Sequence, residues 1–429
     1  KMRFFYNLMT VILVIAAIPV FAYRCLRQEG FGERLRQSFG CLPAHALDKV
    51  AHKNCIWLHA ASVGEIVATS PLVKELKKAM PETPVLVSVV TASGYSMAKR
   101  ILTDVDGLIF FPLDLPWLPR RVLAKVRPQA FLLVETELWP NFLYAAKQYK
   151  IPVMMVNGRI SDRSVKRYHY LKGILRDMLD TVERFCMQSA IDEQYIIQLG
   201  ADPHRVIVTG NTKFDQTYTH VSPEEREVLK QELTLTGHAP ILVAGSTHAG
   251  EEEVLLKAFL KVREAYPQAA LILAPREILR VDELVKLCLT KGLPVRRRTQ
   301  QANQGGQGGV VILDTIGELG RIYSVGDVVF VGGSLVAHGG HNILEPAAHG
   351  KAILIGPHMF NFKETYALFS GRQACSTVCD AQELTESVLH LLQDSKERQR
   401  MEALTLDIVR ENKGASQRSI CYLQELLQK

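Results

Sequence analysis

A chain of 429 residues is too long for one ordinary hydrophobic core, so two or more domains are expected. With 47% hydrophobic and 22% charged residues, the composition is that of a globular protein and excludes an intrinsically disordered one. The net charge of +7 is concentrated in residues 1–40, where six basic side chains face two acidic ones, which argues against a general nucleic-acid-binding protein.

The first predicted element is an apolar run, FFYNLMTVILVIAAIPVFAY, at residues 4–23. About 20 apolar residues are enough to cross the hydrocarbon core of a bilayer, although Asn7, Thr10 and Pro19 weaken the pattern. A signal peptide is the alternative, but no small-residue cleavage site follows the run. We therefore predict an uncleaved membrane anchor over residues 1–40, which spans the membrane or lies in its interface. More arginines follow the run than precede it, so the main body is expected on the cytoplasmic side.

From residue 55 onward, short apolar runs alternate with longer amphipathic stretches, among them 66–79 and 164–180. Continuous apolar strands separated by helices are typical of a parallel sheet covered on both faces. The strands predicted in the first half lie at 55–60, 84–90, 107–113, 130–136, 152–158, 184–189 and 205–210. Those predicted in the second half lie at 240–246, 270–276, 310–315, 327–333 and 352–357.

A polar stretch at 216–238, with a helix-start signal at SPEE, connects the two halves. The predicted division is an anchor with its basic flank at 1–40, a domain at 41–220, and a domain at 221–429 that ends in helices. Both domains are expected to be Rossmann-like, doubly wound α/β sheets that face a central cleft, where ligands bind in this architecture. This is the GT-B arrangement of many glycosyltransferases, although a fold alone does not establish a reaction.

A glycine-containing turn, HAASVGE, directly follows the first predicted strand. Gly64 permits a tight turn, and a helix is expected to begin near Glu65, where the helix dipole would normally keep the carboxylate ionised. An ionised carboxylate in a cleft can act as a general base toward an alcohol. The competing interpretation is a capping box of Ser62 and Glu65, which requires no catalytic function.

Two acids, Glu135 and Glu137, stand at the end of the fourth predicted strand, in VETELWPN. Acids there cost solvation free energy unless they are paired or used, and strand alternation predicts that both point to one face, with Thr136 opposite. The competing interpretation is that Glu137 pairs with an arginine and caps a helix that starts at Pro140. Lys213, in GNTKFD, is a candidate to neutralise a phosphate or carboxylate, although a solvated lysine is the default.

Three strand ends in the second half carry polar or flexible residues. In AGSTHAGEEE, the backbone N–H groups of Ser246 and Thr247 suit an anion. In APRE, Arg276 is a candidate for binding a phosphate or a cytosine carbonyl. The turn DTIGEL, at 314–319, could flank a base with its backbone.

The stretch HGGHNILEPAAHG, at 338–350, places His341, Glu345 and His349 four residues apart, as a metal site on one helix face would require. Pro346 argues against that interpretation, because it keeps a long helix from running through the stretch. The chain also lacks a C-x-x-C pair, a Walker loop and H-E-x-x-H. We therefore predict neither a metal nor a cofactor, and we interpret the histidines mostly as bystanders.

The helix start in this stretch has two possible registers. Either Asn342 is the N-cap with Glu345 at the third helical position, or Glu345 is the N-cap and Pro346 comes first. Paired glycines at 332–333 and 339–340 would let the backbone approach a ligand closely. In either register, the glycine turns and the helix start favour an anion site, with ligand contact through Asn342 and Glu345.

Together these motifs resemble one family, the 3-deoxy-D-manno-octulosonic acid (Kdo) transferases of lipopolysaccharide assembly. The resemblance runs from about residue 57 to 364 and rests on WLHAASVGE, VETELWPN, GNTKFD, APRE, GELG and GGSLVAHGGHNILEPAAHGKAILIGPHMFNFKE. It implies a GT-B enzyme that transfers Kdo from CMP-Kdo to a lipid A precursor, lipid IVA, with inversion and without a metal. The anionic acceptor, together with the basic residues beside the anchor, implies association with anionic lipids of the inner membrane, and no nucleic acid is expected.

By the same resemblance, Glu65 looks like the general base, and Glu137 and Lys213 look like residues that stabilise charge in the transition state. The family commonly has histidine where this chain has Glu277, which puts a donor contact of Glu277 in doubt. The CMP site implied by the resemblance, with the Ser246 turn beside it, consists of Ser246, Pro275, Arg276, Ile316, Gly317, Glu318, Asn342, Ile343, Leu344 and Glu345.

Two alternatives stay open. Another GT-B enzyme that uses a nucleotide sugar, such as a UDP-sugar transferase or epimerase, would carry a uridine-type base pocket and would need no anchor. A membrane-tethered module that binds nucleotide or lipid without turnover would leave Glu65 without a role.

Overall fold

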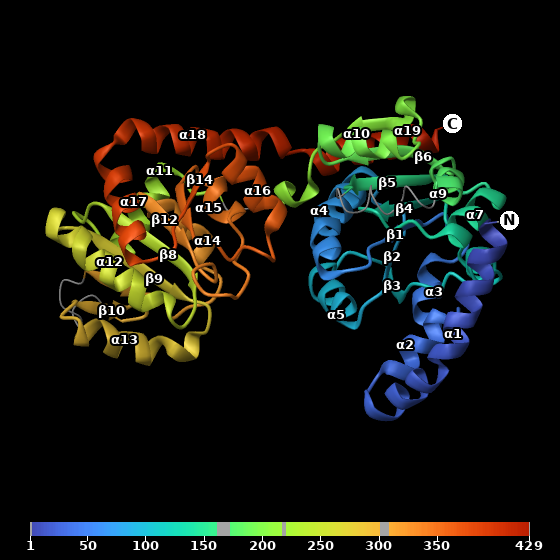
Figure 1. Ribbon diagram of the computed structural model, residues 1–429, viewed down its shortest axis with the longest axis horizontal. Coiled ribbons are helices and arrows are strands. Elements are labelled where there is room, and N and C mark those ends of the chain that lie inside the picture. The colour runs from blue at the N-terminus through green and yellow to red at the C-terminus, as the bar shows by residue number, and fades with distance from the viewer. Residues whose placement is uncertain (1, 161–171, 217–219, 301–308, 429) are drawn as a thin grey trace. The chain divides into compact units, whose positions relative to one another are not determined.

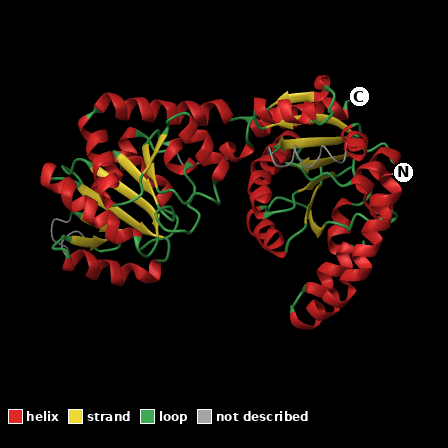
Figure 2. Cartoon of the chain, viewed as in Figure 1, coloured by secondary structure: helices red, strands yellow, loops and turns green. Residues whose placement is uncertain are grey.

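The computed structural model describes residues 2–160, 172–216, 220–300 and 309–428. Its internal contacts divide the chain into two compact units, Lys1–Gln216 with Asn412–Lys429, and Thr217–Glu411. Each unit is an α/β domain with a parallel sheet between helices (Figure 1 and Figure 2).

The first unit contains a seven-stranded parallel sheet with the order β3-β2-β1-β4-β5-β6-β7. All seven strands predicted in the first half are present, most of them shorter than the apolar run that predicts them. Their bounds are β1 Ile56–His59, β2 Val85–Val89, β3 Gly107–Phe110, β4 Ala130–Val134, β5 Val153–Gly158, β6 Val182–Met187 and β7 Val206–Val208.

Helices connect these strands. The predicted helix 66–79 is α4, Val63–Ala79, which begins three residues earlier. Of the predicted helix 164–180, α9 covers Lys172–Leu179, while residues 161–171 lie outside the described part of the chain. The other helical elements of this sheet domain are α5 Ala92–Ile101, α6 Leu118–Val126, α7 Pro140–Gln148, α10 Ala190–Gln198, η2 Pro203–Arg205, η3 Thr212–Asp215 and α19 Ala415–Leu427.

Both faces of the first sheet are buried. Trp57 and Phe131 belong to one buried cluster, and Ile56 and Leu58 belong to another. None of these four side chains is more than 1% exposed. Because successive strand residues point to opposite faces, burial on both sides explains why the strands are continuous apolar runs rather than alternating ones.

The end of the chain departs from the predicted division, which assigned 221–429 to one domain. The last helix, α19, contacts α4 and η3 of the first unit. The carboxylate of Asp215 accepts hydrogen bonds from the backbone N–H groups of Gly414 and Ser416. The chain therefore returns to the first unit from Asn412 onward.

The second unit contains a seven-stranded parallel sheet with the order β10-β11-β9-β8-β12-β13-β14. Its two edge strands, β10 (Val295–Arg297) and β14 (Cys375–Thr377), escape the sequence pattern, because three-residue strands with the sequences VRR and CST contain no apolar run. The five predicted strands are β8 Ile241–Thr247, β9 Ala270–Pro275, β11 Val310–Ile312, β12 Val328–Val331 and β13 Ala352–Ile355.

The polar connection at 216–238 contains α11, Pro223–Glu232. The helix start indicated by SPEE is confirmed: Glu225 N donates to Ser222 Oγ at 3.2 Å, and Ser222 N donates to Glu225 Oε2 at 2.8 Å. The remaining helical elements are α12 Glu251–Ala265, η4 Ile278–Arg280, α13 Val281–Thr290, α14 Leu319–Ile322, η5 Tyr323–Val325, α15 Leu344–Ala348, α16 Lys363–Gly371, α17 Ala381–Gln393 and α18 Ser395–Asn412.

The apolar run near the N-terminus lies in a single helix, α1 (Met2–Arg27). Two short helices follow it, α2 (Phe31–Ser38) and α3 (Ala44–Val50). By length and composition, α1 is the one helix in the described residues that could cross a membrane.

In each sheet the strand order reverses near the centre, between β1 and β4 in the first unit and between β8 and β12 in the second. Loops that leave such neighbouring strands run to opposite faces of the sheet, and the crevice between them is where doubly wound sheets bind ligands. Glu65 follows β1, while Glu135 and Glu137 follow β4. Ser246 lies at the end of β8, and the glycine-rich stretch 332–343 follows β12.

Candidate active site

Glu65, the third residue of α4, is buried at the carboxyl end of β1 and is only 8% exposed. Its Oε2 accepts a hydrogen bond from Ala61 N at 2.7 Å, and its Oε1 accepts one from Ser62 Oγ at 2.8 Å. Ser62 Oγ in turn accepts from Glu65 N at 3.4 Å. The side chain therefore folds back on its own turn, much as the capping interpretation expects, although the backbone donor is Ala61 rather than the N-cap Ser62.

Burial raises the pKa of Glu65 to about 7, and the nearby carboxylates of Glu137 and Glu135 reinforce the shift. The expectation that the helix dipole keeps Glu65 fully ionised is therefore wrong, because desolvation outweighs the dipole and the two hydrogen bonds. A carboxylate with a pKa near 7 suits proton abstraction at neutral pH, since it binds a proton tightly while remaining partly ionised.

The two acids after β4 lie beside different partners. β4 ends at Val134, and Glu135 has a φ of 61°, in the left-handed region that non-glycine residues rarely adopt. Strand alternation therefore stops before these residues and does not set their directions, although both carboxylates lie near enough to Glu65 to raise its pKa. Glu135 Oε1 lies 3.8 Å from Lys213 Nζ, and Glu137 Oε2 lies 3.8 Å from His59 Nε2.

The competing interpretation of Glu137 fails as well. α7 begins at Pro140 as expected, but its N-cap is Trp139, with no side-chain capping hydrogen bond. The basic side chain recorded beside Glu137 is that of His59, 3.8 Å away, and not an arginine. Neither capping nor an arginine pair accounts for an acid at position 137.

His59, the last residue of β1, joins this group although no sequence argument singled it out. It is fully buried and stacks on Phe111 with ring centroids 3.8 Å apart. Ser88 Oγ accepts from Trp57 Nε1 at 2.8 Å, so its own hydrogen can be donated to His59 Nδ1, 2.9 Å away. Ser88 O, which can only accept, also lies 3.3 Å from Nδ1, so the Ser88 contacts fit either tautomer, and Nε2 is the nitrogen that faces Glu137. Burial lowers the pKa of His59, so the ring is neutral near pH 7.

Lys213 lies on the short helix η3, which hydrogen bonds hold in place. Thr212 N donates to Asn157 Oδ1 at 2.9 Å, and Thr212 Oγ1 donates to Ala68 O at 2.8 Å. The side chain of Lys213 is 24% exposed and points its ammonium group toward Glu135. The default of a fully solvated lysine therefore does not apply.

In the second unit, the loop after β12 is built around a buried carboxylate. Glu251, the first residue of α12, is fully buried. Its two oxygens accept four backbone hydrogen bonds, from His248 N (2.9 Å), Gly333 N (2.7 Å), Ser334 N (3.0 Å) and Leu335 N (2.9 Å). Part of the glycine turn expected to hold a ligand anion is therefore occupied by an anion of the protein itself.

The end of β8 is also shaped by a close approach of two loops. Ser246 has a φ of 54° and lies at an irregularity in the pairing of β8 with β9. A Cβ on Gly332 would lie 2.5 Å from Ser246 O, so only glycine fits there. At this position the glycine brings two loops of the protein together rather than a ligand, and anion binding by the Ser246 amide stays a prediction.

Arg276 directly follows Pro275, the buried last residue of β9, and its side chain is exposed. Its backbone N donates to Thr247 O at 2.9 Å. Burial raises the pKa of Glu345, and the positive charge of Arg276 opposes that rise. Arg276 and Glu345 therefore lie near each other, although they come from separate loops.

The helix in HGGHNILEPAAHG starts in neither predicted register. α15 covers only Leu344–Ala348 and has Ile343 as its N-cap, so Pro346 is the third helical residue. Asn342 Oδ1 accepts from Leu344 N at 3.0 Å and fixes the turn. Because Ile343 and Leu344 are buried, a ligand would meet their backbone rather than their side chains.

The turn DTIGEL presents a different surface. Ile316 is 89% exposed, and Gly317 has a φ of 90°. Glu318 is held more firmly, because Arg298 Nη2 donates to its carboxylate at 3.2 Å and the hydroxyl of Thr315 donates to the other oxygen. Of the three predicted residues, Ile316 and Gly317 are therefore the accessible ones.

The histidines of this region contact the protein itself. His341 Nε2 lies 2.8 Å from His248 Nε2, and His349 Nε2 lies 2.6 Å from Gly320 O. Burial lowers the pKa of His341 to about 4, and the neighbouring His248 adds to the shift. Within the described ranges, no group of three or more His, Cys, Asp or Glu side chains is arranged to hold a metal ion.

Comparison with known proteins identifies the family to which the chain belongs. A family model described as 3-deoxy-D-manno-octulosonic-acid transferase (kdotransferase) matches residues 33–216. A 3-deoxy-D-manno-octulosonic acid transferase of Haemophilus influenzae is 31% identical over 435 residues, which cover 100% of this chain and 99% of the relative. The chain belongs to the Kdo transferase family. It is a glycosyltransferase that transfers Kdo in lipopolysaccharide biosynthesis.

A further relative and a solved structure are also similar to this Kdo transferase. The Kdo transferase of Bordetella pertussis is 31% identical over 388 residues, 87% of each chain. The crystal structure of UDP-GlcNAc 2-epimerase from Neisseria meningitidis matches with a TM-score of 0.55, 14% identity, and coverage of 87% of this chain and 100% of the epimerase. At that identity, the likeness shows the fold alone, the GT-B type of two parallel-sheet α/β domains.

Two residues of this transferase escaped sequence reasoning, and both lie inside stretches that were singled out. His59 is the third residue of WLHAASVGE, and Glu251 lies in AGSTHAGEEE. A histidine on an apolar strand and an acid at a helix start are both ordinary features, so neither identifies a role alone. Their roles depend on partners far away in the chain, such as Glu137 and Gly333.

A pair of variants tests the contact between His59 and Glu137. His59→Asn keeps a polar atom near the Nδ1 position and loses Nε2, whereas His59→Gln places its amide nitrogen near Nε2. We expect His59→Asn to lower kcat by about tenfold, because it removes one interaction with the charged Glu137 carboxylate. We expect the kcat of His59→Gln to stay closer to that of the wild type. Steady-state kinetics and thermal melts check this; equal losses in both variants would assign His59 to packing alone.

Proposed function

We propose that this enzyme transfers Kdo from CMP-Kdo to the lipid A precursor lipid IVA, with inversion at the anomeric carbon and without a metal. The observation that carries the proposal is Glu65, a buried carboxylate with a pKa raised to about 7 at the β1/β4 switch point of a Kdo transferase. A group with this pKa at the ligand-binding edge of the sheet is suited to act as a general base.

In the proposed reaction, the acceptor hydroxyl oxygen attacks the anomeric carbon of Kdo while Glu65 takes the hydroxyl proton. The bond between that carbon and the phosphate oxygen breaks, and CMP leaves as an anion with the bonding electron pair. Attack on the face opposite the leaving group inverts the configuration. Glu137 and Lys213 stabilise the charges that develop in the transition state.

The nucleotide is assigned to the second unit. Arg276 is an exposed cation past the end of β9 and is suited to the CMP phosphate. The turn of Ile316 and Gly317 supplies an accessible backbone for the base, and Asn342 and Glu345 supply polar groups at the start of α15. Pro275, Glu318, Ile343 and Leu344 shape these turns, and the Ser246 amide is the candidate for a further anion contact.

The membrane is the other partner in this proposal. α1 is long and apolar enough for membrane attachment, and Arg24, Arg27, Arg34 and Arg36 follow or end it. We place the enzyme on the cytoplasmic face of the inner membrane, where those arginines favour anionic lipids. An acceptor with acyl chains would reach the enzyme from the same surface.

The purified enzyme, CMP-Kdo and tetra-acylated lipid A precursor test the proposal, with products read by mass spectrometry. We expect addition of Kdo to the lipid and release of CMP, with similar rates before and after EDTA treatment, because Arg276 rather than a metal would offset the phosphate charge. A UDP-sugar in place of CMP-Kdo is the control for the alternative of another nucleotide-sugar enzyme. Transfer from that donor alone, or loss of activity in EDTA, would contradict the proposal, and binding without transfer would leave a tethered binding module.

A further inference from the structure

Helix α1 exposes most of its apolar side chains. Eleven large apolar residues between Phe4 and Leu26 are at least 47% exposed, among them Leu13 and Ile15 near the middle of the helix. A contiguous apolar surface of this length does not stay in water on a soluble domain. The remaining question is whether α1 crosses the bilayer or lies along it.

One face of α1 is partly covered along nearly its whole length. The half-buried positions lie three or four residues apart along one face of the helix: Tyr6, Asn7, Thr10, Val11, Val14, Ala17 and Phe21. Two polar residues that weaken the apolar run, Asn7 and Thr10, are therefore both on the covered face. The exposed faces are left almost uniformly apolar from Phe4 to Tyr23.

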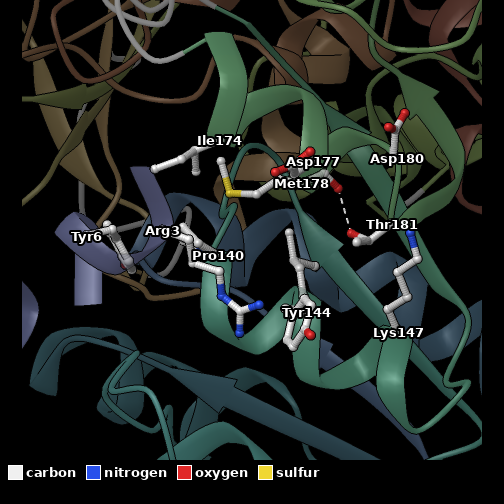
Figure 3. A pocket seen from close by; sticks show the side chains of 11 residues that line it. Arg3, Tyr6, Pro140, Tyr144, Lys147, Ile174, Asp177, Met178, Asp180 and Thr181 are labelled. Carbon is white, nitrogen blue, oxygen red and sulfur yellow. Dashed lines mark hydrogen bonds between the residues drawn. The ribbon is translucent and has the colours of Figure 1, made fainter. Parts of the chain in front are cut away.

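The start of α1 is bound to the sheet domain of the first unit. Tyr6 OH donates to Asp114 Oδ2 at 2.9 Å, and Asp114 also accepts the backbone N–H groups of Asn141 and Phe142 at the start of α7. Figure 3 shows Tyr6 and Arg3 beside α7, with the guanidinium of Arg3 directed at the ring of Tyr144, 3.3 Å from its centroid. This end of the helix is held by a buried carboxylate.

A cavity of about 300 Å³ lies at the same junction of α1, α7 and α9. Its lining combines the cations Arg3 and Lys147 with the acids Asp177 and Asp180 (Figure 3). Charged groups of both signs fit the headgroup region and not the hydrocarbon core. The start of α1 is therefore suited to headgroup depth.

The other end of α1 is bound to the same domain through α2. The rings of Phe21 and Phe31 have centroids 6.3 Å apart, and α1 and α2 lie side by side in Figure 1. From α2, Arg34 Nη2 donates to Val90 O at 2.8 Å, and Gln37 Oε1 accepts from Phe110 N at 2.9 Å. Both ends of α1 are thus tied to one body.

These ties limit how far the end of α1 can move from the sheet. Only nine residues, 28–36, lie between Arg27 and Gln37. Six of them belong to α2, whose eight residues span about 12 Å at about 1.5 Å per residue. The hydrocarbon core to be crossed is about 30 Å thick. If α2 unwound to reach that far, Glu33, Arg34 and Arg36 would be drawn into hydrocarbon, at roughly 2.5–3.5 kcal/mol for each buried charge.

We infer that α1 is an in-plane membrane helix: it embeds its exposed apolar faces in one leaflet of an anionic phospholipid bilayer and does not cross it. Helices of this kind lie about 5–10 Å deep, at the boundary of headgroups and acyl chains. The exposed side chains of Arg24, Arg27 and Arg36 supply the charge for anionic headgroups. The inference rests on the membrane attachment proposed above and is independent of the transfer reaction.

Depth measurements along α1 test the inference in the full-length enzyme. In a background with the exposed cysteines Cys25, Cys41, Cys379 and Cys421 replaced by serine, single cysteines at Phe5, Leu8, Ile12, Ile15 and Val20 would each carry a spin label. The protein would be bound to phosphatidylglycerol–phosphatidylethanolamine vesicles. We expect all labels at similar shallow depth in one leaflet. A depth that increases steadily to a maximum near the middle of α1 would mean a spanning helix and would overturn the inference.

Sidedness gives a second, independent readout. Arg3→Cys, at the start of α1, and a variant that retains only Cys379 among the exposed cysteines would be labelled with a membrane-impermeant maleimide in right-side-out and inverted membrane vesicles. We expect both sites to react in the same vesicle orientation, whereas opposite orientations would overturn the in-plane helix. Flotation with vesicles tests the membrane attachment separately from the in-plane orientation of α1. A protein that does not float with lipid would overturn the attachment itself.

Discussion

Replacing Glu65 by glutamine is expected to lower the rate of Kdo transfer by about 10²- to 10⁴-fold, the range that a general base contributes. Glutamine has nearly the same shape and can still accept from Ala61 N and donate to Ser62 Oγ, the two partners of the native carboxylate. The loss would therefore come from proton abstraction and not from the fold. Initial rates with CMP-Kdo and a lipid A precursor measure it, and nucleotide binding should stay near wild type.

Ser62→Ala is the matched control for the capping interpretation. It removes the hydroxyl that bonds the Glu65 carboxylate and caps α4, at a cost of about 1 kcal/mol of stability. If Glu65 acts only as a cap, Ser62→Ala and Glu65→Gln should have similarly small effects on transfer. Near-normal activity of Glu65→Gln would eliminate the base assignment.

The raised pKa of Glu65 gives the same prediction a pH signature. A base must be ionised, so kcat/KM should fall as the pH drops below about 7, the folded pKa. The contribution of Glu65 to stability has the opposite pH dependence. Because the pKa is raised above its ordinary value of 4.5, this group stabilises the fold at low pH, and that contribution is lost as the pH rises from 4.5 to about 7.

Glu65→Gln should therefore gain stability while it loses activity. At pH 8 the native carboxylate is ionised in a site that disfavours its charge, at a cost of about 3 kcal/mol for a shift of this size. The neutral amide avoids that cost, so the melting temperature of the variant should exceed that of the wild type at pH 8 and approach it at pH 5. A melting temperature below wild type at both values would argue against the raised pKa.

Much of the fold follows from burial on both faces of the two sheets. Residues such as Ile56 and Trp57 are adjacent in sequence and pack on opposite faces, so the first three positions of β1 are apolar and stand out from the flanking loops. The same reasoning misses β10 and β14, because an edge strand of three residues needs no apolar run. It also misses the return of the chain at Asn412, which depends on Asp215 accepting two distant backbone N–H groups.

In the candidate site, too, local sequence patterns indicate some features, whereas others depend on distant residues. Glu65 and Arg276 stand at strand ends, which local patterns indicate, and the order of a doubly wound sheet then brings strand ends together. The protonation behaviour of Glu65 was not predictable in this way, because it comes from desolvation and from Glu137, more than 70 residues away. The helix register at Pro346 was equally hidden, since the Asn342 side chain accepts from Leu344 N as an N-cap would, yet α15 begins at Leu344, one residue later than that cap predicts.

Glu251→Ala is expected to destabilise the second unit by roughly 3–5 kcal/mol and to abolish binding of the donor nucleotide. Four backbone N–H groups, from His248 to Leu335, would lose a charged acceptor inside a fully buried site, and each hydrogen bond to a charged group contributes about 1.5–3 kcal/mol. The sum is reduced because water can enter the space left by the side chain. Chemical denaturation and CMP titration measure the two effects.

Glu253→Ala provides the control for this prediction. Glu253 lies in the same first turn of α12 and shares its helix-dipole position, but its side chain is exposed. A change of at most about 0.5 kcal/mol is expected there, as for surface substitutions in general. If both variants lost stability equally, the helix dipole would be responsible. If only Glu251→Ala does, the acid acts as an internal anion that fixes the loop carrying Gly333, from which the chain continues to Asn342 and Glu345.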